Sequence, residues 1–281
     1  MRVLTLLFAL GAFAADRDLD GVADELEQSL LERFVPRFYV AKNDCDLAPA
    51  EFERGRMEPV LKQRNGTIYG QVFAVSGGME IHYFHLWAED CGKIRHKLDA
   101  EHVSGFLIEE KGEWRARYWY AAAHEDTVCD RGAAARAGLL NAEWRGPEVW
   151  ISRGKHASFL SEGACRAGCG SDRCDRSERL AVAQVINLGE AGNRLNGSDW
   201  LMAPDWNLRE KMGSDFPSDL RKALDKSKRI IAANPATPGV QPVILAGSTT
   251  IDSLALANTK TEGALSKAHK ATKAWLRKHL N

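Results

Sequence analysis

The chain has 281 residues, of which 44% are hydrophobic and 27% are charged, as in an ordinary folded globular protein. This composition excludes intrinsic disorder and collagen-like structure. The 38 basic and 38 acidic side chains give a formal net charge of zero. That balance argues against nucleic acid as a partner, because affinity for this polyanion comes from many Lys and Arg contacts with phosphates.

Residues 1–15 have the features of a secretory signal peptide. A single charge, Arg2, precedes an apolar run over residues 3–13, and small alanines lie at its end. The run is shorter than the roughly 20 residues that span a bilayer. We therefore expect cleavage near Ala15, a secreted or periplasmic protein, and no transmembrane segment.

A calcium-binding pattern directly follows this segment. The spacing DxDxDGxxDxxE has glycine at its sixth position and glutamate at its twelfth. Carboxylate oxygens suit Ca²⁺, glycine permits the sharp turn, and the glutamate can bind through both oxygens. We expect an EF-hand-like Ca²⁺ loop without an entering helix, formed by Asp16, Asp18, Asp20, Val22, Asp24 and Glu27. The alternative is that these acids only cap the following helix.

The calcium loop and a short helix together are expected to occupy residues 16–35. Apolar residues recur every four positions, which is typical of a helix with one buried face. They are Val22, Leu26, Leu30 and Phe34. Pro36 ends the helix, because the residue before a proline avoids helical backbone angles.

Residues 36–231 are expected to form a mainly β domain, an antiparallel β-sandwich. Six segments are rich in β-branched or aromatic residues and are bounded by Gly, Pro, Asn or Asp. They are 67–75, 80–88, 100–110, 113–123, 147–153 and 181–188. Short strands without helices between them favour a sandwich. Strict alternation in the fourth segment would place Trp114, Ala116, Tyr118 and Tyr120 on one face.

The C-terminal part is expected to be an arm followed by a helix. Residues 232–259 begin with a proline-rich stretch of few charges, which predicts a linker or extended arm. Residues 260–281 are basic with a thin apolar stripe, which predicts an amphipathic helical tail. We expect this helix to dock on the sandwich. The alternative, a helix on a membrane surface, would normally carry a larger apolar face.

Six cysteines in an exported chain predict three disulfides. Six thiols allow 15 pairings, so the spacing leaves the connectivity open. The candidates are Cys45, Cys91, Cys129, Cys165, Cys169 and Cys174. The last three lack the paired CxxC of a zinc ribbon, so we expect disulfides there and not a thiolate zinc site.

The segment HKLDAEHV is the candidate metal site. Asp99 and Glu101 lie two apart on an extended chain, so they project from one face, and His96 can fold over them. Adjacent carboxylates repel and persist on a partly buried face when a cation or shared proton neutralises them. We expect His96, Asp99 and Glu101 to hold Mg, Ca, Mn or Zn and to leave positions for water or substrate. Ordinary ion pairs on a solvated strand are the alternative.

Two more histidines are candidates for catalysis. His124 and His156 each follow a predicted strand, and the loops at one end of a sandwich lie together. We expect both to approach the HKLDAE segment, where an imidazole can act as general acid or base. Lys155 would offset developing negative charge.

The order of these motifs resembles the Vps62-related family of β-sandwich proteins. HKLDAEHV is followed by an aromatic strand ending in AHED and then by PEVWISRGKHASF. His96, Asp99 and Glu101 also have the HxxDxE spacing of a heptad in the necrosis-inducing, Nep1-like proteins. The first resemblance implies the fold. The second implies a divalent cation that helps recognise sphingolipid head groups.

Three functions fit these residues. The first is a metal-dependent hydrolase of phosphoester or glycosidic bonds, in which the cation would polarise substrate and activate water. The second is a binding protein, in which the cation bridges to a sugar or lipid head group and no bond breaks. The third is a structural exported protein with merely paired carboxylates. We expect a small-molecule, glycan or lipid head-group ligand, and leave open peripheral contact with a membrane.

Overall fold

The computed structural model describes residues 15–206, apart from 76, 94, 125–130, 170–171, 175, 191–192 and 205, and the backbone of 240–244 and 250–254. The predicted signal peptide apart from Ala15, Cys129 and the predicted helix over 260–281 lie outside these residues. No helix in the described part of the chain is long and apolar enough to cross a membrane.

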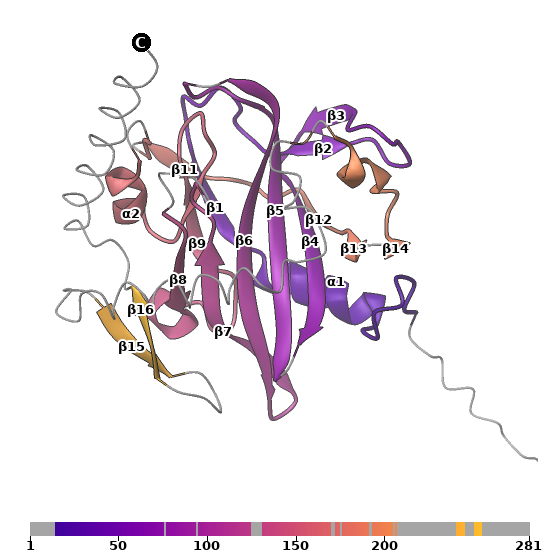
Figure 1. Ribbon diagram of the computed structural model, residues 1–281, viewed down its shortest axis with the longest axis vertical. Coiled ribbons are helices and arrows are strands. Elements are labelled where there is room, and N and C mark those ends of the chain that lie inside the picture. The colour runs from indigo at the N-terminus through magenta and orange to yellow at the C-terminus, as the bar shows by residue number, and fades with distance from the viewer. Residues whose placement is uncertain are drawn as a thin grey trace, which may run out of the picture.

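The fold is a mainly β sandwich, as the sequence predicts (Figure 1). The larger sheet has the order β12 (Gln184–Asn187), β4 (Thr67–Val75), β5 (Gly78–Asp90), β6 (His96–Glu110), β7 (Glu113–Ala121) and β8 (Ala133–Arg136). The smaller sheet has the order β10 (Ser158–Phe159), β9 (Glu148–Ile151), β1 (Arg37–Ala41) and β11 (Ser177–Arg179). Two pairs, β12 with β4 and β1 with β9, are parallel, and the other pairs are antiparallel. All six predicted strands are present.

Smaller elements surround the sheets. The strand pairs are β2 (Ala50–Phe52) with β3 (Leu61–Arg64), β13 (Gly189–Glu190) with β14 (Asn193–Arg194), and β15 (Val240–Ile244) with β16 (Thr250–Leu254). The helices are α1 (Asp24–Phe34), α2 (Glu162–Ala167) and the 3₁₀ turns η1 (Ala137–Leu140) and η2 (Asp199–Met202). The β15–β16 pair lies within the predicted linker, which is therefore partly an antiparallel ribbon.

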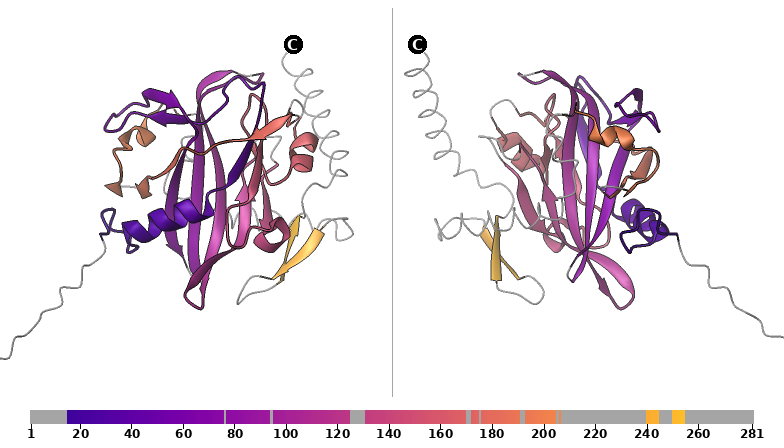
Figure 2. Two further views of the ribbon diagram at one scale, coloured as in Figure 1. Left: turned by 180° about the vertical axis from the view of Figure 1, so that it is seen from behind. Right: turned by 45° about the vertical axis from the view of Figure 1, so that its right-hand side comes forward.

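The main core fills the space between the two sheets. Trp87 and Trp119 of the larger sheet are buried there with Phe38 of the smaller one. Helix α1 lies across β4 and β12 and adds its apolar face to this core (Figure 2). Gly70 makes this approach possible, since a Cβ there would lie 2.3 Å from Leu31 Cδ2.

A second core covers the outer face of the larger sheet. Phe84 of β5 points to this outer face, whereas its neighbour Tyr83 points into the main core. Phe84 lies in one buried cluster with Phe52 of β2, Trp200 and Trp206. Since both faces of β5 are covered, all residues from 80 to 87 are buried, including Glu80, His82 and His85.

The predicted alternation along β7 is interrupted by a β-bulge. Ala116 pairs with Leu107 and Tyr118 with Phe106, so Arg117 is the extra residue. A bulge moves the following side chains to the opposite face. The expectation that Ala116 shares a face with Tyr118 and Tyr120 is therefore wrong. Trp119, not Tyr118, joins Ala116 in the main core.

Candidate functional site

Three loops meet at one end of the sandwich, around a disulfide. Cys45 in the β1–β2 loop is bonded to Cys91, which directly follows β5. The β9–β10 loop joins them, because the Cys91 amide donates to the Gly154 carbonyl at 2.8 Å and the Gly154 amide donates to Asp44 Oδ1 at 2.9 Å. These contacts hold together the loops that lie next to Asp44, Asp90 and His156.

Asp90, His96 and Asp99 form a group that could hold a cation. Each offers one ligand atom, and the three atoms lie within 4.8 Å of one another. Asp90 and His96 face each other across the start of the β5–β6 pair, with Asp90 Oδ2 and His96 Nε2 3.5 Å apart. Burial, together with the negative charge of Asp99, raises the pKa of Asp90. A bound cation would relieve this repulsion between carboxylates.

Glu101 is not part of this group, although the sequence places it among the expected ligands. It lies opposite His85 of β5, while Asp99 lies opposite Trp87. Side chains two positions apart on a strand share a face but are separated by roughly 6 to 7 Å along it. Asp90 lies three residues beyond Trp87 on β5, opposite His96, and offers an oxygen to the same group as Asp99. The cation group is therefore displaced toward the loops.

His156 is a buried cation between two carboxylates. Its Nδ1 lies 3.1 Å from Asp99 Oδ2 and its Nε2 lies 3.6 Å from Asp44 Oδ1, and its ring stacks on Trp87 with centroids 4.0 Å apart. Burial lowers the pKa of the ring, but its contacts with Asp44 and Asp99 outweigh burial and raise the pKa of His156 to about 9. The imidazolium therefore fixes the position of the Asp99 carboxylate.

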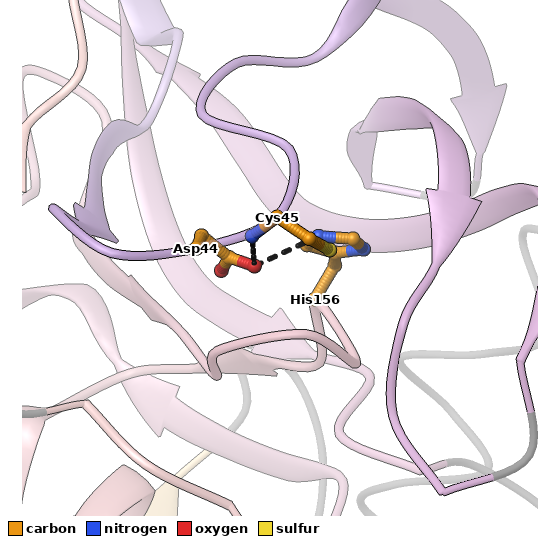
Figure 3. A group of neighbouring side chains, drawn as sticks. All are labelled: Asp44, Cys45 and His156. Carbon is orange, nitrogen blue, oxygen red and sulfur yellow. Dashed lines mark hydrogen bonds and ion pairs between the residues drawn. The ribbon is translucent and has the colours of Figure 1, made fainter.

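Figure 3 shows Asp44, Cys45 and His156, which also lie close enough to suggest a metal site. Asp44 Oδ1 accepts a hydrogen bond from the Cys45 amide at 2.7 Å and pairs with His156. The sulfur of Cys45 is in a disulfide and the imidazole is protonated, so neither can act as a ligand. This group is a structural ion pair.

His124 and Lys155 belong to a different cluster, centred on Asp172. His124 Nε2 lies 2.8 Å from Asp172 Oδ2, and Lys155 Nζ lies 3.3 Å from Asp172 Oδ1. Burial raises the pKa of Asp172, but its contacts with His124 and Lys155 outweigh burial and lower the pKa overall. The structure thus brings His156 to Asp99, as expected, but does not place His124 in the group around Asp99.

This Asp172 cluster holds the cysteine-rich loop. Cys165 and Cys174 form a disulfide, and Cys169 is also disulfide-bonded. The Cys169 amide donates to Asp172 at 2.5 Å, and Lys155 donates to the Cys169 carbonyl at 3.2 Å. The disulfides are consistent with export from the cytoplasm.

Buried His85 and Ser158 resemble a base and nucleophile, but their hydrogen bonds have the wrong polarity. The Trp87 indole N–H donates to His85 Nδ1 at 2.8 Å, so Nδ1 is the acceptor. In the neutral ring the proton then resides on Nε2, which donates to Ser158 Oγ at 2.6 Å. His85 therefore does not accept a proton from Ser158.

The predicted calcium loop brings Asp16, Asp18 and Asp24 together, with one oxygen of each within 4.8 Å of the others. Asp20 instead accepts the Val22 amide at 2.7 Å and closes the turn. Asp24 was expected to be a Ca²⁺ ligand, but it forms an ion pair with the guanidinium of Arg17.

Buried carboxylate oxygens face this loop without a hydrogen-bond donor. Asp18 is 4% exposed and neither of its carboxylate oxygens has a partner, and Glu27 is fully buried with Oε1 unpaired. The other oxygen of Glu27 accepts Asn187 Nδ2 of β12 at 2.8 Å. Burial, with the neighbouring negative charges, raises the pKa of Glu27 to about 8. These oxygens fit a hard cation.

Asp90 and Asp44 were not predicted from the sequence. Each lies beside a half-cystine, Asp90 before Cys91 and Asp44 before Cys45. The Cys45–Cys91 bond would have pointed to both, but the spacing does not select it among the 15 connectivities that six thiols allow.

Comparison of the sequence with known protein families and with curated proteins finds no match. Several solved structures are similar to the fold. The non-toxic HaNLP3 protein is 14% identical, with 75% of this chain and 97% of that chain covered and a TM-score of 0.46. NLPPya in complex with glucosamine is 17% identical, with 71% and 89% covered and a TM-score of 0.41. Necrosis and Ethylene inducing Protein 2 from the agent of cocoa's Witches Broom disease is 17% identical, with 66% and 84% covered and a TM-score of 0.39. Similarity at this level assigns no ligand to the chain, and the Vps62-related resemblance stays a prediction.

Proposed function

We propose that this chain is an exported protein that binds a small sugar or lipid head-group ligand through a divalent cation held by Asp90, His96 and Asp99. The convergence of these three ligand atoms at the loop end of the sandwich carries the proposal. One nitrogen and two carboxylates suit Mg, Ca, Mn or Zn and leave positions for ligand oxygens.

Binding is favoured over hydrolysis because the expected catalytic groups are engaged elsewhere. His156 is fully buried between two carboxylates, so it cannot reach a substrate. His124 and Lys155 are held by Asp172. A hydrolase could instead use His96, whose side chain is 28% exposed within the cation group.

The cation assignment is tested by titrating Mn²⁺ into Asp90→Asn, with Asp18→Asn in every protein so that the N-terminal loop does not contribute. We expect one equivalent to bind the parent and none to bind the Asp90 variant. Glu89→Gln is the matched control, because Glu89 is the preceding carboxylate and pairs with Arg95. Stoichiometric binding by Asp90→Asn would remove the proposed site.

Binding and hydrolysis are separated by mass spectrometry of glycans and phospholipid head groups after incubation with the Mn²⁺-loaded protein. We expect bound ligand to be recovered intact. A cleaved product that forms only in the parent and not in Asp90→Asn would instead establish the metal-dependent hydrolase.

The N-terminal loop is proposed to hold a structural Ca²⁺ through Asp16, Asp18 and Glu27. The unpaired, buried oxygens of Asp18 and Glu27 support this. Bound Ca²⁺ at 100 times its Kd would stabilise the fold by about 2.7 kcal/mol. With Asp90→Asn in every protein so that the other cation group does not contribute, we expect EGTA to lower the Tm of the parent and of Glu25→Gln, an exposed control, but not that of Asp18→Asn. An equal shift in Asp18→Asn would exclude Ca²⁺ at this loop.

A further inference from the structure

A pocket of about 480 Å³ lies over the Cys45–Cys91 disulfide, beside the cation group. This volume is in the range of small-ligand sites. Four of the lining side chains are basic, and they come from two loops. They are Lys93, Arg95, Arg153 and Lys155.

The pocket carries two cationic side chains that no described carboxylate neutralises. Arg95 lies 3.7 Å from Glu89 and Lys155 lies 3.3 Å from Asp172, but Lys93 and Arg153 are exposed and form no ion pair with a described residue. The acidic residue in the lining, Asp44, is already engaged by His156 and by backbone amides. The local excess is therefore about two positive charges.

Gly92 leaves room for the side chain of Lys155 at the pocket. A Cβ on Gly92 would lie 2.8 Å from Lys155 Cγ, so only glycine lets the Lys155 stem pass. The Gly92 amide also donates to Asp90 Oδ1 at 2.6 Å. Gly92 thus lines the pocket while its amide contacts the cation group.

We propose that this pocket binds a phosphate monoester carried by the ligand. A phosphate monoester carries about −1.5 to −2 charges at neutral pH, which matches the two unneutralised cations. Lys and Arg donate charge-assisted hydrogen bonds to such groups. This assignment rests on the proposed function, because the ligand that carries the monoester is the one proposed to bind through the cation. Binding of inorganic phosphate tests the anion pocket separately.

The experiment is a titration at low salt with inorganic phosphate, and with glucose 6-phosphate and glucose in the presence of Mn²⁺. The variant Lys93→Gln/Arg153→Gln is compared with Arg54→Gln/Lys111→Gln, which removes the same charge from other loops. We expect phosphate and glucose 6-phosphate to bind at least tenfold more weakly to the first variant and within twofold of the parent to the second. Glucose should bind at least tenfold more weakly than its phosphate. Unchanged phosphate affinity in the first variant, or equal affinity for glucose, would overturn the inference.

Two further arms separate the alternatives. Tighter binding to phosphatidylcholine vesicles containing phosphatidic acid than to glucose 6-phosphate would assign the monoester to a lipid head group, and the reverse order would assign it to a soluble compound. Asp90→Asn distinguishes the two proposals. If it still binds Mn²⁺ while Lys93→Gln/Arg153→Gln loses phosphate, the cation assignment fails and the anion pocket stands.

Discussion

Replacement of His156 by Gln should destabilise the whole sandwich. The ring is fully buried, contacts Asp99 and Asp44 and stacks on Trp87. Gln is neutral, so the substitution leaves two buried carboxylates without their cation and removes the contact between a cationic ring and the indole face.

The expected loss follows from this geometry. Removing one partner from a buried ion pair costs about 3 to 5 kcal/mol, because the remaining charge stays buried without compensation. For a domain of this size, each kcal/mol corresponds to a Tm change of about 2 to 4 °C. We therefore expect the Tm of His156→Gln to fall by about 6 to 20 °C. An exposed pair offers a contrast: Lys42→Gln, which breaks the contact with Glu178, should cost at most about 1 kcal/mol.

Urea unfolding of four proteins checks the reasoning: the parent, His156→Gln, Asp99→Asn and the double variant. The double variant should be less destabilised than the sum of the single variants by at least about 1 kcal/mol, since Asn relieves the charge that Gln leaves unpaired. Additive effects, or a loss below about 1 kcal/mol for His156→Gln, would show that the ring is not a buried cation.

Three other predictions follow from separate parts of the fold. Burial raises the pKa of Glu51, but its contacts with Lys62 and neighbouring amides outweigh burial and lower it to about 2. The stabilisation from the Glu51 carboxylate is therefore present above about pH 4.5 and is lost as the pH falls toward 2. Glu51→Gln should lower the free energy of unfolding by about 2 kcal/mol at pH 7. In urea titrations at different pH values, the stability of this variant should depend less on pH in the acid range. Gly70→Ala should lower the free energy of unfolding by about 1 to 3 kcal/mol in the same assay. The control Gly163→Ala should not destabilise the protein, because a Cβ at this position meets no atom within 4 Å. Equal effects of the two substitutions would contradict the packing of α1 against β4. The Cys45→Ser/Cys91→Ser variant should lose about 4 kcal/mol in unfolding free energy for a 46-residue separation, and an unchanged stability would refute a constraining role.

The sandwich was predictable because its strands are encoded locally. Each of the six segments carries a β-rich run bounded by turn residues, and each is a strand. The face assignment in β7 failed at Arg117, because a bulge adds one residue and nothing in the local sequence marks it. The parallel pairing of β12 with β4 also depends on residues far apart in the chain.

The candidate site was predictable only in part. His96 and Asp99 were found because they lie on one strand, and His156 was found because strand ends gather in sandwiches. Asp90 and Asp44 required the disulfide pairing, which spacing does not supply. The burial of His156 depends on Asp44 and Trp87 from two other elements and is a property of packing.

The hydrogen bond from Asn187 to Glu27 joins residues 160 positions apart, and β12 supplies the outer strand beside β4. Contacts of such sequence separation are slow to form. During synthesis, α1 and β4 can therefore contact β12 only after residues 184–187 have been made. Truncation before residue 184 would leave β4 as an open strand edge, a template for association between chains.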